Sequence, residues 1–263
     1  MGFAKAECYH PILFSIYIDD IVTSVARSNA SLSFNFVCMS VFLYADDILL
    51  ISPSVSLLQK LVNIVENDLL LLDMSINPKK SVCLRVGQRF EASCANILLS
   101  NGSVIPWVTQ CRYLGVYFQS ARYFKCVFDE SKKLWFRSFN AIYGKVGRFA
   151  SLEVVFQLII SKCLPAFTYG LNACPINSSD RKFLDFAIFR TVAKIIGTFD
   201  NTIIADCRNA FGLNNIVETI NKLKIRFLMR YTAAENNICR VFVSSVTNEL
   251  TTLREQQNLS SAH

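Results

Sequence analysis

Two short apolar runs separated by a pair of acidic residues are the most constraining feature of this chain. Residues 42–51 read Phe-Leu-Tyr-Ala-Asp-Asp-Ile-Leu-Leu-Ile, and the apolar runs Val41–Leu43 and Ile48–Ile51 have the length of strands. Because Asp tolerates turns, the pattern predicts an antiparallel hairpin with Asp46 and Asp47 at or beside its bend. Bare carboxylates at such a tip suit Mg²⁺, which prefers oxygen ligands. The alternative interpretation is an ordinary solvated hairpin turn.

The same four-residue pattern occurs twice, in different surroundings. Tyr17-Ile18-Asp19-Asp20 has the spacing of Tyr44-Ala45-Asp46-Asp47, but its apolar neighbours recur at steps of three and four residues. That period belongs to one face of a helix. We therefore expect Asp19 and Asp20 on a solvated helix surface, and only Asp46 and Asp47 remain candidates for a metal site.

Composition excludes several classes of protein. The 263 residues are enough for one large or two modest domains. Although 52% of the residues are apolar, no run reaches the roughly 18 apolar residues of a membrane span, and no secretory signal pattern opens the chain. The ten cysteines include no Cys-x-x-Cys pair and only two histidines accompany them, so zinc-ligand spacing is absent. We expect an intracellular protein with reduced cysteines and no membrane partner.

Charge is divided unevenly along the chain. Residues 1–111 hold 7 Lys and Arg against 9 Asp and Glu, a net charge of −2, whereas residues 112–263 hold 20 against 11, a net charge of +9. On a helix beginning near Val127, Lys133 and Arg137 are expected to share an exposed flank with Lys145 and Arg148. A basic flank of this kind suits a polyanion, and the alternative is an ordinary solvated helix surface.

Apolar periodicity divides the chain near residue 120. Before that point helices and strands alternate, with an amphipathic helix from Leu58 to Asp73 for which Ser56 and Gln59 have capping-box spacing. The expected strands are Ser81–Val86, Ile97–Ser100, Ser103–Val108, and a tight pair within Cys111–Phe118. The expected helices beyond it are Val127–Phe149, Leu152–Cys163, Arg181–Ile196 and Ile216–Tyr231. The predicted fold class is α+β, followed by a polar, frayed tail at 249–263.

Taken in order, these motifs resemble the later part of the palm of a reverse transcriptase from a non-LTR (LINE-like) retrotransposon. A helix containing Leu13-Phe14 precedes Phe42–Asp47, and Ile76–Ser81 and Arg112–Val116 follow. The corresponding order in that family is a helix, the catalytic Tyr-x-Asp-Asp hairpin, a lysine-bearing loop and the Tyr-Leu-Gly primer grip. The resemblance covers roughly residues 11–118. The helical stretch containing Leu164-Pro165 and Tyr169-Gly170 is more loosely similar to the thumb.

The resemblance implies an RNA-directed DNA polymerase with two Mg²⁺ or Mn²⁺ ions as cofactors and RNA template, DNA primer and dNTP as partners. It implies a partial right-hand palm at 1–120, a thumb-like region at 121–248 and a nuclear location. Asp46 and Asp47 would be the catalytic metal ligands, and Lys80, or less favourably Lys79, the catalytic loop lysine rather than a solvated turn residue. The nucleic-acid contacts implied by the resemblance, or expected from the basic flank, are Tyr44, Tyr113, Leu114, Gly115, Lys133 and Arg137. A plain β-turn is the alternative for residues 113–115.

The chain also departs from the family pattern. The third catalytic Asp and the fingers would lie upstream of Phe14, and Lys5–His10 stand where the family has an Arg-Gln-Gly loop. We therefore expect an inactive, N-terminally truncated remnant or a partial gene model. Two other interpretations stay open, a non-catalytic nucleic-acid-binding module and a helical interaction or scaffold protein. Primer extension would identify a polymerase, salt-sensitive binding without extension a binding module, and neither activity a scaffold.

Overall fold

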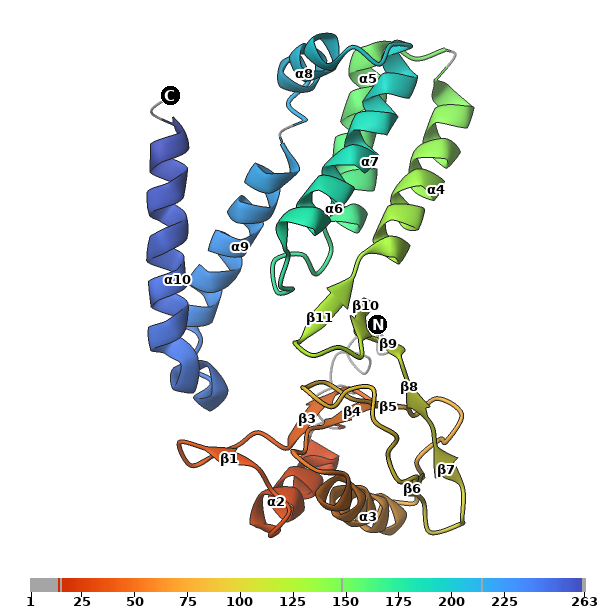
Figure 1. Cartoon of the computed structure of the whole chain (residues 1–263), viewed down its shortest axis with the longest axis vertical. Coiled ribbons are helices and arrows are strands. Elements are labelled where there is room, and N and C mark those ends of the chain that lie inside the picture. The colour runs from red at the N-terminus through yellow and green to blue at the C-terminus, as the bar shows by residue number, and fades with distance from the viewer. Residues whose placement is uncertain (1–13, 15, 148, 214, 262–263) are drawn as a thin grey trace, which may run out of the picture. The chain divides into compact units, whose positions relative to one another are not determined.

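The computed structural model describes residues 14, 16–147, 149–213 and 215–261, and these form two compact units (Figure 1). Unit 1 comprises the described residues up to Arg85 together with Arg89–Thr109, and unit 2 comprises Val86–Gln88 and the described residues from Gln110 onward. Both helices and small sheets are present, which agrees with the predicted α+β class. Within the described residues, no helix combines the length and apolar character that a membrane crossing requires.

Unit 1 is built on two helices, α2 (Asp19–Arg27) and α3 (Val55–Leu71), which pack against each other. Two antiparallel hairpins lie between these helices in sequence: β1 (Ser33–Phe34) with β2 (Val37–Cys38), and β3 (Val41–Tyr44) with β4 (Asp47–Leu50). After α3 come a parallel pair of β5 (Cys83–Leu84) and β8 (Trp107–Val108), and an antiparallel pair of β6 (Ile97–Leu98) and β7 (Val104–Ile105). The β6–β7 hairpin turns around Asn101-Gly102, between the strands expected at Ile97–Ser100 and Ser103–Val108.

The apolar faces of the unit 1 helices form its core. One cluster joins α2, α3 and β3 through Ile21, Val25, Leu61, Val65 and Val41, all of which are buried. A second cluster packs the other side of α3 against the later strands and contains Val62, Cys83, Ile97, Leu99 and Ile105. Because the β3–β4 hairpin is part of the first cluster, its base is held by helix packing and its tip is left at the surface.

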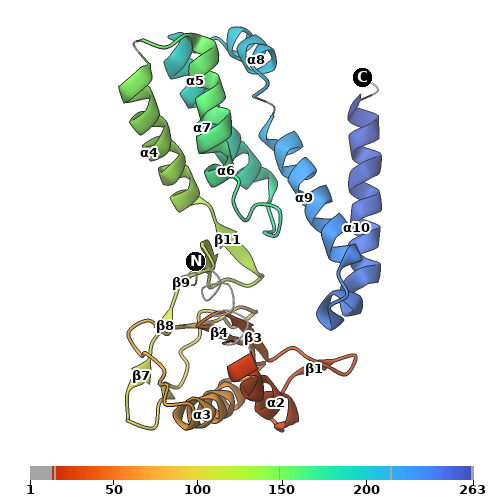
Figure 2. The same cartoon turned by 180° about the vertical axis from the view of Figure 1, so that it is seen from behind.

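Unit 2 combines a three-stranded antiparallel sheet with a set of helices (Figure 2). The sheet has the order β11-β10-β9, formed by β9 (Gln110–Tyr113), β10 (Val116–Gln119) and β11 (Lys125–Val127). The helices are α4 (Asp129–Val146), α5 (Leu152–Leu158), the π-helix η1 (Ile159–Cys163), α6 (Leu164–Phe167), α7 (Ser178–Ile196), α8 (Asn201–Ala210), α9 (Ile216–Ala233) and α10 (Asn237–Ser261).

The core of unit 2 is centred on aromatic residues of α4, α5 and α6, which pack against α7. Trp135, Phe139, Phe156 and Phe167 are almost completely buried, and the Trp135 and Phe167 ring centroids are 4.8 Å apart. The buried indole N–H of Trp135 donates a hydrogen bond of 2.8 Å to Oγ1 of Thr191, so its polar atom is satisfied across the α4–α7 contact. This satisfied contact fixes the position of α4 against α7.

The expected helix 152–163 forms, but its last turn is a π-helix. Pro165 follows two residues later and cannot donate the helical hydrogen bond to the carbonyl of Ser161. The turn is wider than a regular one, because the amide of Leu164 donates to the carbonyl of Ile159, five residues back, and not to that of Ile160 four residues back. A proline that removes one bond of the regular ladder is thus accommodated without a sharp break.

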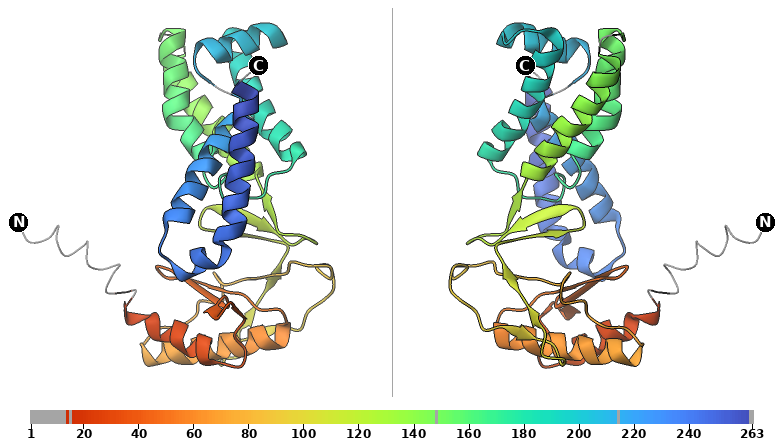
Figure 3. Two further views of the ribbon diagram at one scale, coloured as in Figure 1. Left: turned by 90° about the vertical axis from the view of Figure 1, so that its left-hand side faces the viewer. Right: turned by 90° about the vertical axis from the view of Figure 1, so that its right-hand side faces the viewer.

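Two helices form where the apolar periodicity of the sequence predicts none. α8 lies between the expected helices, and α10 runs to Ser261 through the segment predicted to be a frayed tail. α10 packs against α9, as the left view of Figure 3 shows, and Leu250 is buried against Ile225 and Leu228. Packing between the two helices therefore compensates for the polar composition of the tail.

Candidate active site

The β3–β4 hairpin has the geometry that its sequence predicts. Tyr44 pairs directly with Asp47, so Ala45 and Asp46 form a two-residue turn between the strands. Ala45 takes a φ of 50°, which is the kind of left-handed backbone that tight hairpin turns require of their first central residue. Asp46 therefore lies in the turn and Asp47 is the first residue of β4.

Alternation along the two strands separates the core side of the hairpin from its open side. The cross-strand pair Leu43–Ile48 joins the core cluster with α2 and α3. The next pair, Tyr44–Asp47, belongs to the opposite face because side chains alternate along a strand. Tyr44 is 63% exposed, and Asp46 and Asp47 are also exposed. The hairpin thus presents two adjacent carboxylates and a tyrosine to solvent on a base held by packing.

The second copy of the motif has a different environment, as predicted. Asp19 and Asp20 form the first turn of α2, where both are exposed. The hydroxyl of Tyr17 donates a hydrogen bond of 3.4 Å to the carbonyl of Leu72, so it is tied to the end of α3. Negative side chains in a first helical turn interact favourably with the helix dipole. Asp19 and Asp20 therefore have a structural role that Asp46 and Asp47 lack.

The donor set of the hairpin suits a single hard cation. Mg²⁺ commonly takes one or two carboxylates and completes its coordination with water and substrate phosphates, and Asp46 with Asp47 can supply those carboxylates. A pair of catalytic ions, about 4 Å apart, needs ligands on both sides. Within the described residues no group of three or more His, Cys, Asp or Glu side chains is gathered where it could hold a metal. The described residues fit one ion and do not complete a two-ion site.

Lys79 and Lys80 lie in a turn that follows α3 and are both exposed. The amide of Lys79 donates to Oδ1 of Asn77, and the amide of Lys80 donates to the Asn77 carbonyl. Asn77 thus shapes the turn, with Pro78 inside it. Among the ion pairs of the described residues, none joins Lys80 to Asp46 or Asp47. The catalytic role of Lys80 stays a prediction.

The Tyr113–Gly115 segment belongs to unit 2 and forms the turn between β9 and β10. Tyr113 pairs with Val116, and the two turn residues Leu114 and Gly115 have φ values of 46° and 81°. The hydroxyl of Tyr169 donates a hydrogen bond of 3.0 Å to the Leu114 carbonyl. A Cβ on Gly115 would lie 2.8 Å from Cε1 of the Tyr169 ring. Glycine is therefore required here by an intramolecular contact with a residue more than 50 positions away, which local sequence does not indicate.

The basic flank of α4 is less uniform than its sequence indicates. Lys133 and Arg137 are both exposed, but Nζ of Lys133 lies 2.6 Å from Oε1 of Glu130, one turn earlier. The hydrogen bond and the charge of Glu130 raise the pKa of Lys133, so this lysine stays protonated and already has an anionic partner. Arg137 takes part in none of the ion pairs of the described residues. Arg148, expected on the same flank, lies outside the described residues.

Comparison with known families agrees with this geometry. Residues 10–118 match the family model described as reverse transcriptase (RNA-dependent DNA polymerase). The matched segment contains the β3–β4 hairpin and ends within β10, just after the Leu114-Gly115 turn. The match supports a reverse-transcriptase-like function. Members of that family bind a nucleic-acid template and primer and dNTPs, and they generally use divalent metal ions. No curated protein matches the chain.

Proposed function

We propose that residues 10–118 are the later part of the palm of an RNA-directed DNA polymerase of the non-LTR retrotransposon type. In this proposal Asp46 and Asp47 hold a divalent cation, Mg²⁺ or Mn²⁺, at the tip of the β3–β4 hairpin. The helical part of unit 2 corresponds to a thumb that binds the primer–template backbone. The 263-residue chain by itself does not synthesise DNA, because its described residues provide only one side of a two-ion site.

The hairpin tip carries the proposal. Two adjacent carboxylates at an exposed two-residue turn, next to an exposed tyrosine, distinguish residues 44–47 from the helical copy of the motif. Neither Asp46 nor Asp47 takes part in an ion pair within the described residues. Carboxylates that stabilise neither a helix terminus nor an ion pair are available to an external cation.

We assign a separate role to each residue of the proposed site. Asp46, in the turn, is the principal ligand, and Asp47 on β4 assists it from the face that also presents Tyr44. Tyr44 would contact the primer end and hold it beside the carboxylates. A bound cation supplies Lewis-acid stabilisation of charge on phosphoryl oxygens. Lys80 would interact with the departing pyrophosphate as a point charge.

Terbium luminescence tests the metal site without any requirement for catalysis. Tb³⁺ binds carboxylate sites, and its emission is sensitised by a nearby tyrosine, here Tyr44. We expect emission that Mg²⁺ and Mn²⁺ suppress by competition. The double variant Asp46→Asn/Asp47→Asn should lose most of the emission, and Tyr44→Phe should lower the emission while Mn²⁺ binding, measured by electron paramagnetic resonance, persists.

The duplicated motif provides a matched control within the same chain. Asp19→Asn/Asp20→Asn removes the same two charges from the same Tyr-x-Asp-Asp pattern, but from helix α2. We expect this variant to keep the emission and the competition by Mg²⁺. If both double variants lower the emission equally, or if neither does, the hairpin is not a cation site and the polymerase assignment loses its supporting observation.

Nucleic-acid binding without catalysis is the second candidate function, and the basic surface of unit 2 favours it. Arg137 and Lys145 project from α4 into solvent, and neither belongs to an ion pair of the described residues. Salt-sensitive binding of a primer–template by a chain that does not bind Tb³⁺ at the hairpin would favour this candidate. A chain with neither property would match the scaffold alternative.

A further inference from the structure

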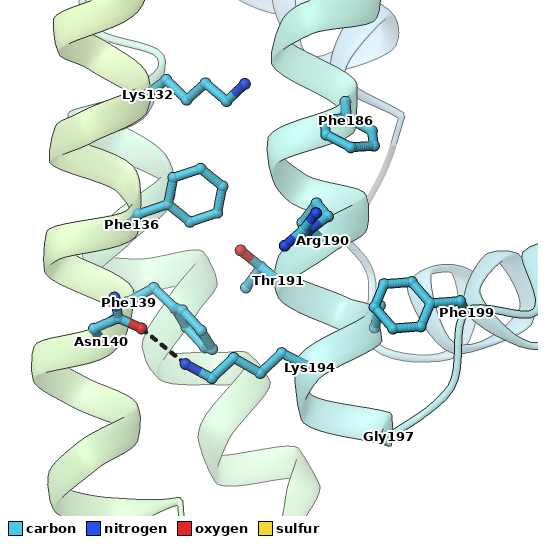
Figure 4. Close-up of a pocket in the computed structure, with 11 residues that line it drawn as sticks. Lys132, Phe136, Phe139, Asn140, Phe186, Arg190, Thr191, Lys194, Gly197 and Phe199 are labelled. Carbon is cyan, nitrogen blue, oxygen red and sulfur yellow. Dashed lines mark hydrogen bonds between the residues drawn. The ribbon is translucent and has the colours of Figure 1, made fainter.

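A groove lies between α4 and α7 within unit 2 (Figure 4). Its volume is about 660 Å³, enough for a small ligand or a short stretch of a polymer. In Figure 4, Lys132 and Phe136 extend from α4 toward α7, and Lys194 of α7 reaches back toward Asn140. The residues that line it include Lys132, Phe136, Asn140, Phe186, Arg190 and Lys194.

The charged residues of the groove are all cationic. Lys132, Arg190 and Lys194 line it, and no carboxylate is among its described lining residues. None of these three cations takes part in an ion pair with another described residue. A concave surface with unpaired charges of one sign attracts a ligand of the opposite sign.

Aromatic rings alternate with these cations. Phe186 is 48% exposed and Phe199 is 69% exposed, so both offer ring surface to a ligand. Nζ of Lys132 lies 3.9 Å from the Phe183 ring centroid, and the Arg190 guanidinium lies 5.8 Å from the Phe186 ring centroid. These cation–π contacts hold each positive group beside a ring without neutralising it.

The spacing along α7 places ring and charges on one face. Phe186, Arg190 and Lys194 follow one another at four-residue steps and are all exposed, and each step advances about 6 Å along a helix. Lys182 extends the row by one further step, and it lines a second hollow that shares Phe186 with the first. The result is a track along which a ring is flanked by cations on both sides.

The floor of the groove is fixed. Oγ1 of Thr191 accepts the Trp135 indole N–H and donates a hydrogen bond of 3.0 Å to the Ala187 carbonyl. At the mouth, Nζ of Lys194 donates to Oδ1 of Asn140 at 3.1 Å and retains two further donors for a ligand. The polar groups of the floor are satisfied by the protein, so recognition falls to the three cations and the exposed rings.

We propose that the α4–α7 groove binds single-stranded nucleic acid, with phosphates at Arg190 and Lys194 and a base stacked on Phe186. Single strands combine repeated negative charge with flat apolar bases, and exposed rings interleaved with cations match that combination. A duplex presents phosphates but keeps its bases stacked inside, and an acidic peptide presents carboxylates without rings to stack. Like the proposed function, this inference has nucleic acid as the partner. It depends on residues of the groove, and not on the β3–β4 hairpin or on the basic flank of α4.

Fluorescence anisotropy with labelled ten-nucleotide oligo(rU) and oligo(dT) tests the proposal, with an RNA–DNA hybrid of the same length as comparison. We expect Arg190→Ala/Lys194→Ala to weaken single-strand binding at least tenfold and to reduce the log–log salt slope by about 1.4, which is roughly 0.7 for each lost phosphate contact on a single strand. Phe186→Ala should weaken binding about five- to hundredfold with little change in the slope, because stacking carries no counterion release.

A charge-matched control separates the groove from the general positive charge of the chain. Lys222→Ala/Arg230→Ala removes two exposed cations from α9, where no exposed ring lies between them in the sequence. We expect less than a twofold effect. Phe186→Leu, which keeps apolar bulk, should no longer quench 2-aminopurine placed within the oligonucleotide. Melting of each variant by circular dichroism verifies that unit 2 is folded.

Four results would overturn the inference. The first is that the chain binds no single strand, and the second is that Lys222→Ala/Arg230→Ala weakens binding as much as Arg190→Ala/Lys194→Ala does. The third is that the chain binds the hybrid as tightly as the single strands and that Phe186→Ala has no effect. The fourth is that oligo(glutamate) binds as tightly as oligo(rU). The last result would assign the groove to an acidic peptide. A preference for oligo(rU) over oligo(dT), or the reverse, identifies which single strand the groove takes. Failure here leaves Tb³⁺ binding at the hairpin unchanged, so the two proposals fail separately.

Discussion

The hydroxyl of Tyr169 and the carbonyl of Leu114 are joined by a hydrogen bond of 3.0 Å across 55 residues of sequence. This bond places the Tyr169 ring against the backbone of Gly115, where a Cβ would approach Cε1 to 2.8 Å. The following residue, Gly170, has a φ of 76°, and a Cβ there would lie 2.7 Å from Cγ2 of Val116. The β9–β10 turn and the 169–170 segment therefore fit together only because both glycines lack a side chain.

The first prediction is that Gly115→Ala destabilises unit 2 more than a glycine substitution in open space. A left-handed backbone costs alanine about 1–2 kcal/mol, and displacement of the Tyr169 ring adds the loss of its hydrogen bond, about 1 kcal/mol. Gly212→Ala is the control, because its φ is 70° and nothing lies within 4 Å of its Cβ position. Urea unfolding followed by Trp135 fluorescence in a Trp107→Phe background measures both.

A double-mutant cycle isolates the contact itself. In a Tyr169→Ala background the ring is gone, so Gly115→Ala should cost no more than Gly212→Ala. If the cost of Gly115→Ala is the same with and without the ring, the close approach has no energetic consequence and backbone conformation alone explains the glycine.

Local pattern was enough to predict the β3–β4 hairpin, because strand length and turn chemistry are encoded by neighbouring residues. It was not enough for contacts between distant segments. Ser56 and Gln59 have capping-box spacing, yet Ser54 caps α3 and accepts a bond from the Leu57 amide. Gln59 instead bonds both the amide and the carbonyl of Leu98, 39 residues away. Such pairings depend on tertiary packing, which periodicity does not reveal.

Helix α10 is not evident from the sequence for a related reason. α10 is rich in Ser, Thr and Val, which have low helix propensity and blur the apolar stripe. Its helical state follows from packing of Leu250 against Ile225 and Leu228 of α9.

The Tyr169 contact could have been suspected from the Tyr-Gly pair at 169–170, but nothing in the sequence indicates that Leu114 is its partner.

The second prediction concerns the buried indole of Trp135. Thr191→Val keeps the size of the side chain but removes the hydroxyl that accepts the indole N–H at 2.8 Å, and leaves only the Ala187 carbonyl at 3.3 Å. A poorly satisfied buried donor costs about 1–3 kcal/mol. We expect a loss of this size in the unfolding free energy of unit 2, measured by circular dichroism. In a Trp135→Phe background the substitution should cost clearly less, and an equal cost would show that the indole bond contributes nothing.

The third prediction is a loss of unit 1 stability at alkaline pH. Burial, with a smaller contribution from Cys94, raises the pKa of the Cys83 thiol from 9.0 to about 11. Above pH 9 the unfolded chain loses this proton while the folded chain retains it until about pH 11. Unfolding therefore becomes more favourable as pH rises through this window, by about 2–3 kcal/mol in total, and levels off above it.

Trp107 reports on this transition, because it pairs with Cys83 in the β5–β8 sheet. Urea midpoints between pH 8 and 11, followed by Trp107 fluorescence in a Trp135→Phe background, should fall across the window. In Cys83→Ala the fall should largely disappear. A midpoint that falls equally in both would assign the pH dependence to other groups.

The fourth prediction distinguishes two neighbouring cations on α4. If unit 2 binds a primer–template backbone through this flank, Arg137→Ala should flatten the log–log salt slope by about 0.9, the value for one duplex phosphate contact. Lys133→Ala should have a smaller effect, because Glu130 already pairs with this lysine at 2.6 Å. Glu130→Gln should strengthen binding. Fluorescence anisotropy on an RNA–DNA hybrid provides the slopes, and an equal effect of Lys133 and Arg137 would show that the ion pair does not compete with phosphate.

The fifth prediction is that this chain alone does not extend a primer. Asp46 and Asp47 supply one side of a two-ion site, and the described residues gather no third ligand there. A poorly held ion forfeits several kcal/mol of transition-state stabilisation, and each 1.36 kcal/mol is a factor of ten in rate. Extension of oligo(dT) on poly(rA), with Mg²⁺ or Mn²⁺, should therefore stay at background even when anisotropy shows that the primer–template is bound. Asp46→Ala serves as the matched blank. Extension by the unaltered chain that Asp46→Ala abolishes would mean that another residue of this chain completes the site, and would overturn the assignment of inactivity.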